Sequence, residues 1–121
     1  MHVKHVRVKA MNKKIRDSSW ARIKNHINDN YEVGDILKRQ TLIKNIKGVP
    51  TSTIDGYRTR LMFVGIIESS GRGKYRLLHK IPEQMNTIVL FDLIDDQRGQ
   101  PWKVWFIPLE DRLKNYFNRY K

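Results

Sequence analysis

Residues 51–68 carry the pattern that decides the fold, and they read Thr-Ser-Thr-Ile-Asp-Gly-Tyr-Arg-Thr-Arg-Leu-Met-Phe-Val-Gly-Ile-Ile-Glu. Within them, large apolar residues recur at spacings of three, four and three, at Ile54, Tyr57, Leu61 and Val64. That spacing places four side chains on one face of a helix. Gly65 follows at the position where a glycine commonly ends a helix. The stretch therefore predicts an amphipathic helix over residues 52–64.

The start of this helix carries side chains suited to capping. Thr51 and Ser52 follow residues 47–50, whose glycine and proline interrupt helical structure. Either hydroxyl can accept a hydrogen bond from a free amide of the first turn. Residues 52–55 resemble a capping box with Asp55 in place of the usual Glu. Asp55 has a second reading, because a carboxylate can also accept a hydrogen bond from a cytosine amino group.

The neighbouring segments have periodicities of their own. Trp20, Ile23 and Ile27 predict a helix over residues 18–29, with Trp20 in the core rather than stacked on a base. A short extended stretch is expected at residues 33–38 and a short helix at residues 40–46. After the long helix, residues 66–69 and 74–81 read as two strands joined by a Gly-rich turn at residues 70–73.

This order of helix, short strand, short helix, turn, longer helix and glycine-turned hairpin resembles the winged helix-turn-helix superfamily. The likeness covers roughly residues 18–81, about half of the chain. Residues 51–68 resemble the recognition helix, its closing glycine and the first wing strand, and residues 70–76 resemble the wing and the return strand. The resemblance implies an α+β fold in which residues 17–82 form a DNA-binding domain. A small regulator from a phage or other mobile element would fit the size and basicity.

In such a module the second helix of the motif enters the major groove and the wing meets the backbone or the minor groove. Counting 100° per residue, Ser52, Thr59 and Arg60 face outward, and Arg60 is suited to a bidentate contact with guanine. Arg58 lies at the margin of the inward face and either packs inward or reaches a phosphate. The predicted nucleic-acid-binding residues are Thr51, Ser52, Thr53, Arg58, Thr59 and Arg60 on the helix, Arg72 and Lys74 at the wing, and Lys38, Arg39, Lys44 and Lys47 around the short helix.

The charge of the chain is unevenly distributed. Of its 24 Lys and Arg and 12 Asp and Glu, residues 1–80 hold 18 basic and 6 acidic side chains, whereas residues 81–121 hold 6 of each. The whole net charge of +12 therefore lies in the first two thirds, which indicates a polyanionic partner there. Residues 1–16 contain no acid and form either a solvated basic tail or an arm that engages nucleic acid.

Composition excludes several classes of site. The 121 residues are 40% apolar and contain no Cys, so a disulfide, a thiol nucleophile and a cysteine-ligated metal are ruled out. The four His residues lack metal-ligand spacing, and we expect neither a metal nor a cofactor. The chain contains no run of 18 apolar residues, so the sequence predicts no membrane-spanning helix. The N-terminal segment lacks the long apolar run of a secretory signal. We expect a cytoplasmic or nucleoid-associated protein.

The C-terminal third has its own apolar pattern. Residues 87–94 and 102–107 read as two strands of a hairpin around a loop at residues 95–101. After Pro108, an apolar stripe predicts a last amphipathic helix; it consists of Leu109, Leu113, Tyr116, Phe117 and Tyr120. The fold class is therefore α+β, a winged helix-turn-helix domain followed over residues 83–121 by a β-hairpin and an amphipathic helix. This extension either packs on the same chain or forms a homodimer.

The function expected is non-enzymatic binding of duplex DNA by a regulator of transcription or replication. The alternative is an RNA-binding or ribonucleoprotein component, since charge does not distinguish the two polymers. A third reading is a metal-dependent nuclease with carboxylates on one strand and a lysine on the next; its residues would be Asp92, Asp95, Asp96 and Lys103. Major-groove reading requires that Ser52, Thr59 and Arg60 form a ridge free of the body of the protein.

Overall fold

A computed structural model of the chain describes residues 18–99 and 107–119. The fold is α+β, as expected. A helix over residues 18–30 comes first. It is followed by β1 (Ile36–Lys38), α2 (Arg39–Asn45), α3 (Thr51–Val64), β2 (Ile67–Gly71), β3 (Lys74–Leu77), α4 (Thr87–Gly99) and α6 (Leu109–Arg119). The predicted basic arm at residues 1–16 lies outside the described residues.

The three strands form one antiparallel sheet in the order β1-β3-β2. The return strand of the hairpin therefore lies in the middle, and the short strand before α2 pairs with it. In register, Ile36 lies opposite Arg76, and Lys38 lies opposite Lys74. Alternation along β3 buries Tyr75 and Leu77 and leaves Lys74 and Arg76 exposed. The expected strand over residues 74–81 is thus shorter, ending at Leu77.

The sheet and helices share one core. Trp20, Ile23 and Ile27 of the first helix are all buried, as the sequence predicted. The Trp20 indole N–H donates to the carbonyl of Met85 (2.7 Å), so this ring is a core side chain. Asn28 of the same helix exchanges two hydrogen bonds with the backbone of Ile81, which fastens the segment after the sheet to the first helix.

Helix α3 has the predicted apolar face but not the predicted cap. Ile54, Tyr57, Leu61 and Val64 are buried, and Gly65 ends the helix in the left-handed conformation (φ 89°). The N-cap residue is Pro50, and no side chain caps it. The predicted caps were wrong because the extended backbone stops at Pro50, which places both hydroxyl residues inside the first turn.

Helix α4 overturns the predicted hairpin of the extension. Residues 87–94 were expected to form a strand, and residues 95–101 a loop, but the chain is helical from Thr87 to Gly99. Four apolar residues on one helical side are buried, namely Val89, Leu90, Leu93 and Ile94, while Ile88 points to solvent. A short apolar run fits a strand or a buried helix equally well, and packing decides between them. Residues 102–106 of the expected partner strand lie outside the described residues.

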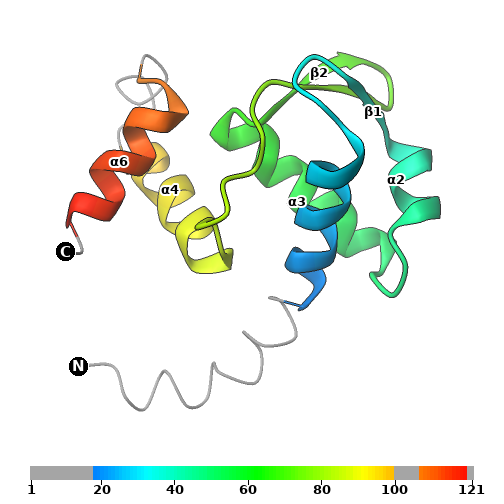
Figure 1. The fold of residues 1–121 in the computed structure, drawn as a ribbon, viewed down its shortest axis with the longest axis horizontal. Coiled ribbons are helices and arrows are strands. Elements are labelled where there is room, and N and C mark those ends of the chain that lie inside the picture. The colour runs from blue at the N-terminus through cyan, green and yellow to red at the C-terminus, as the bar shows by residue number, and fades with distance from the viewer. Residues whose placement is uncertain (1–17, 100–106, 120–121) are drawn as a thin grey trace.

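The last helix agrees with the sequence. Leu109, Leu113 and Tyr116 of α6 are buried, and Glu110 and Asp111 lie in its first turn. Figure 1 shows α4 beside α3 and places α6 and α2 at opposite ends of the molecule. Of the helices in residues 18–99 and 107–119, none has both the length and the apolar character needed to cross a bilayer.

Candidate nucleic-acid interface

A cationic hollow lies between the start of α2 and the turn of the β2–β3 hairpin. It encloses about 600 Å³. The residues that line it are Lys38, Arg39, Gln40, Thr41, Arg72, Gly73, Lys74 and Tyr75. The hollow exists because α2 begins directly after β1, and β1 pairs with the strand that leaves the turn. An amide-to-carbonyl hydrogen bond from Arg39 to Gly73 (2.9 Å) joins the two sides.

The hollow brings like charges together. Lys38 and Lys74 are directly opposite in the antiparallel ladder. Side chains at such positions are neighbours, and like charges there are destabilising. Arg72 stands in the adjoining turn and is exposed. Within the described part of the chain, no carboxylate forms an ion pair with Lys38, Arg72 or Lys74. A bound anion would remove this repulsion, which makes the hollow a suitable place for a phosphate group.

Two glycines shape the turn that carries Arg72. Gly71 and Gly73 have φ values of +142° and +69°, a backbone region that residues with a side chain rarely adopt. The sequence predicted a glycine-turned hairpin here, and the structure has one. The turn aims Arg72 beside Lys74 rather than back onto the sheet, since both line the same hollow.

Arg39 differs from the three other cations of the hollow because it is held by an ion pair. Its guanidinium donates two hydrogen bonds, each 2.9 Å long, to the carboxylate of Asp55 on α3. These hydrogen bonds from Arg39 hold the pKa of Asp55 below its ordinary value, and the same contact raises the pKa of Arg39. The capping role expected of Asp55 is wrong, because no described side chain caps α3 and the carboxylate links α2 to α3. Its contact with a cytosine amino group stays a prediction.

Arg58 takes the inward of its two expected positions. Its side chain is 19% exposed and donates to the hydroxyl of Tyr75 (2.5 Å). The guanidinium also lies over the Tyr75 ring, 4.9 Å from its centre, and 3.5 Å from a carboxylate oxygen of Asp55. Arg58 therefore braces α3 against the sheet.

Arg60 does not stand on a free ridge. The guanidinium lies over the rings of Phe91 on α4 and Tyr57 on α3, at 4.9 and 5.6 Å from their centres. Helix α4 occupies this side of α3, and Thr59, Arg60 and Phe63 line a hollow of about 170 Å³ between the two helices. The expectation that Arg60 points outward was wrong because the segment expected to be a strand is a helix packed against α3.

The remaining predicted residues of α3 are small. Thr51 and Ser52 are exposed, and Thr53 is half-buried. Thr59 is exposed too, but its hydroxyl donates to the carbonyl of Asp55 (3.0 Å), one turn earlier. The hydroxyl of Thr59 thus retains only its acceptor capacity for a ligand.

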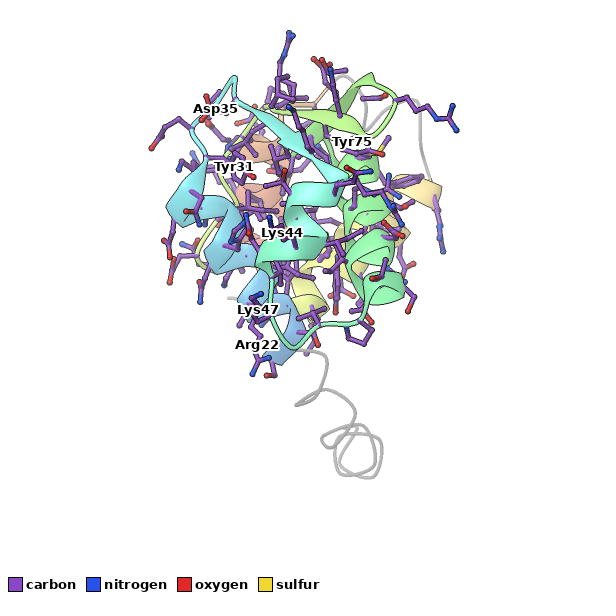
Figure 2. All side chains as sticks on the ribbon, turned by 90° about the vertical axis from the view of Figure 1, so that its right-hand side faces the viewer. Arg22, Tyr31, Asp35, Lys44, Lys47 and Tyr75 are labelled. Atoms are coloured by element: carbon purple, nitrogen blue, oxygen red, sulfur yellow. The ribbon has the colours of Figure 1, made fainter. Side chains whose placement is uncertain are left out.

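A second cationic group lies at the other end of α2, formed by Arg22, Lys44 and Lys47. All three are exposed, and no carboxylate among the described residues pairs with them. Arg22 donates to the carbonyl of Lys47 (3.1 Å), which joins the first helix to the turn after α2. In Figure 2 the three follow one another from the middle to the lower end of the face turned to the viewer. Sequence reasoning missed Arg22, although its place on the polar side of the first helix was visible.

The carboxylates of the nuclease reading do not form a metal site. Asp92 accepts a hydrogen bond from the Tyr116 hydroxyl (2.6 Å), and Asp96 pairs with Arg119 (2.6 Å). Both lie on helix α4 rather than on the strand that this reading required, and Lys103 lies outside the described residues. Across residues 18–99 and 107–119, His, Asp and Glu side chains nowhere gather in threes as a metal ion would need.

Comparisons with protein families, with curated proteins and with solved structures found no match to this chain. The ligand class of the site is therefore inferred from the residues of this chain. Those residues offer exposed cations in two groups at the ends of α2.

Proposed function

We propose that this chain is a winged-helix protein that binds duplex DNA without catalysing a reaction on it, as a regulator of transcription or replication. The observation that carries the proposal is the cluster of Lys38, Arg72 and Lys74 around one hollow, where no carboxylate of residues 18–99 and 107–119 pairs with them. The element order and the β1-β3-β2 sheet support it, because a hairpin returning beside the strand before α2 is the arrangement that the winged-helix resemblance implies.

The position of the hollow suits a nucleic-acid backbone. The wing turn and the start of α2 both present cations to it, and phosphate contacts of this kind set the orientation of a protein on a duplex. The opposite end of the molecule carries α6, whose exposed surface mixes charges of both signs. The proposed partner is therefore met by the α2 end of the protein, and the protein is expected where the DNA is, in the cytoplasm or nucleoid.

Fluorescence anisotropy tests the proposal with three labelled probes of equal length: duplex DNA, single-stranded DNA and duplex RNA. Each is titrated at several salt concentrations, with and without Mg²⁺. We expect the tightest binding to duplex DNA and no cleavage. With six phosphate contacts, the logarithm of the affinity should fall against the logarithm of salt concentration with a slope of about −5.

The matched variants are Arg72→Gln/Lys74→Gln in the hollow and Lys114→Gln on α6, where Lys114 is exposed at the far end of the molecule. The first should weaken binding and flatten the salt slope by about 1.8, since each contact contributes about 0.9. The second should leave both unchanged. Tighter binding to RNA would replace the proposal with the RNA-binding alternative, and equal binding by wild type and the hollow variant would refute it.

Association through residues 83–121 is the remaining proposal about partners. Leu109, Leu113 and Tyr116 of the predicted stripe are buried in the same chain and Phe117 is half-buried, whereas Tyr120 lies outside the described residues. Packing within the chain therefore accounts for the first three positions of the stripe. Light scattering coupled to size exclusion measures whether the chain is nevertheless a homodimer in solution.

A further inference from the structure

The side chains that α3 offers to a base edge are few. Direct reading of bases in the major groove depends on long side chains with fixed donors and acceptors, above all Arg, Lys, Asn and Gln. Helix α3 contains two residues of these four types, Arg58 and Arg60; Arg58 donates to the Tyr75 hydroxyl, and the half-buried Arg60 lies over the Phe91 ring. Releasing Arg58 would break its contacts with Tyr75 and Asp55, and releasing Arg60 would uncover two aromatic rings.

The exposed surface of α3 does not replace them. At its N-terminal end Thr51 and Ser52 present short hydroxyls, which bond bases and phosphates alike. Farther along, Met62 and Phe63 are exposed and apolar. Short hydroxyls and apolar groups on their own discriminate poorly among four base pairs.

Two groups of exposed cations lie away from α3, at the ends of α2. The hollow holds Lys38, Arg72 and Lys74 at the first turn of α2, and the second group begins with Lys44 in its last turn. A helix of seven residues is about 10 Å long, close to the roughly 12 Å width of the major groove. Two cationic groups at this separation can each meet the backbone on one side of a groove.

We infer that the chain holds duplex DNA by its two backbones, through Lys38, Arg72 and Lys74 at one end of α2 and Arg22, Lys44 and Lys47 at the other, and that it binds duplexes of any base sequence about equally. The inference rests on the proposed function and narrows its substrate. Contacts to phosphates position a protein but carry no sequence information directly, so affinity built from them is shared by all duplexes.

The test measures the affinity for four labelled DNA duplexes of equal length and unrelated sequence. A second experiment selects bound duplexes from a randomised pool over several rounds. Four proteins are compared: wild type, Lys44→Gln/Lys47→Gln, Ser52→Ala and Lys114→Gln. Urea unfolding of each confirms that the fold is retained, and all four substituted positions are exposed.

We expect the four dissociation constants of wild type to agree within about threefold and the selection to yield no consensus. The Lys44→Gln/Lys47→Gln variant should weaken binding to all four duplexes by the same factor, roughly 60-fold at 0.1 M salt. That factor follows because two contacts each contribute about 0.9 to the salt slope, and 0.1 M lies one decade below 1 M. Ser52→Ala and Lys114→Gln should bind like wild type.

Three outcomes overturn the inference, and they differ in whether the proposed function stands. A selected sequence bound about 100-fold more tightly than the others, with that preference lost in Ser52→Ala, would show base reading by α3; the inference would fail and the proposed function would stand. Failure to bind any duplex would refute both. Unchanged binding by Lys44→Gln/Lys47→Gln would remove the second cationic group from the interface and refute the inference alone.

Discussion

Replacing one of the two opposed lysines of the hollow by an acid should raise the stability of the fold and lower the affinity for DNA. Lys38 and Lys74 face each other in the β1–β3 ladder, and no carboxylate in the described part of the chain forms an ion pair with either. Replacing Lys74 with Glu turns a repulsive cross-strand pair into an attractive one. Lys74→Glu should therefore stabilise the fold while it weakens the binding of DNA.

The magnitude follows from the geometry of the pair. An opposite-charge pair at directly opposed positions contributes about 0.2–1 kcal/mol, and a like-charge pair costs a similar amount. Because the substitution exchanges one for the other, the free energy of unfolding should rise by roughly 0.5–1.5 kcal/mol at low salt. In a chain of this length about 1 kcal/mol corresponds to about 3–5 °C in Tm.

The assay is urea and thermal unfolding of four proteins at about 10 mM and about 1 M salt: wild type, Lys38→Glu, Lys74→Glu and the double variant. Each single variant should gain stability at low salt. The double variant restores a like-charge pair and should lose the gain. At about 1 M salt the Debye length is about 3 Å, and the differences should shrink. Lys114→Glu on α6 serves as the control for the change in net charge; because it also places a second acid four residues after Glu110, it should lose roughly 0.5 kcal/mol rather than gain stability.

Repulsion between Lys38 and Lys74 is refuted if Lys74→Glu destabilises the protein at low salt. It is also refuted if the effects of the two single substitutions simply add in the double variant. Either result would mean that the two ammonium groups do not repel each other across the ladder. A bound phosphate would then have no such repulsion to relieve in the hollow. A loss of DNA binding together with a gain in stability would show that binding is lost without unfolding.

Three further predictions concern the fold around the site. Hydrogen bonds from Arg39 hold the pKa of Asp55 below its ordinary value, so the stabilisation from this ion pair is present above that value and is lost as the pH falls through the lower pKa of the folded state. In urea titrations over a series of acid pH values, Asp55→Asn should reduce the loss of stability on the acid side of the ordinary pKa. Arg112→Ala removes a hydrogen bond of 2.6 Å to the last carbonyl of α3, and the free energy of unfolding should fall by about 1–3 kcal/mol in urea titrations. Trp20→Phe leaves the carbonyl of Met85 without its indole partner in the core and should cost about 1–3 kcal/mol in the same measurement.

Residues 87–94 were predicted as a strand but lie in helix α4, and this error shows the limit of local sequence patterns. Residues 87–94 are rich in β-branched and aromatic residues, which favour a strand when read alone. A competing signal was present in Asn86, whose side chain accepts a hydrogen bond from the amide of Val89 (2.9 Å) and caps α4. The helix forms because it buries Leu90 and Leu93 against the rest of the core, and this gain is invisible to a reading of adjacent residues.

The sequence by itself determined two helices, predicted over residues 18–29 and 52–64 and observed within one residue of those bounds. It also determined the glycine-turned hairpin, the last amphipathic helix and the concentration of positive charge in the first 80 residues. Those features depend on periodicity, on residues with special backbone freedom and on composition, all of which act over a few neighbouring positions.

Only the tertiary structure decided which cations are free. Arg39 pairs with a carboxylate 16 residues away, Arg58 bonds a hydroxyl 17 residues away, and Arg60 lies on a ring of a helix that the sequence did not predict. The pairing register of β1 with β3 likewise set Lys38 against Lys74. The physical reason is that a charged side chain is available to a ligand only if folding has not already given it a partner, and partners distant in the sequence are chosen by packing.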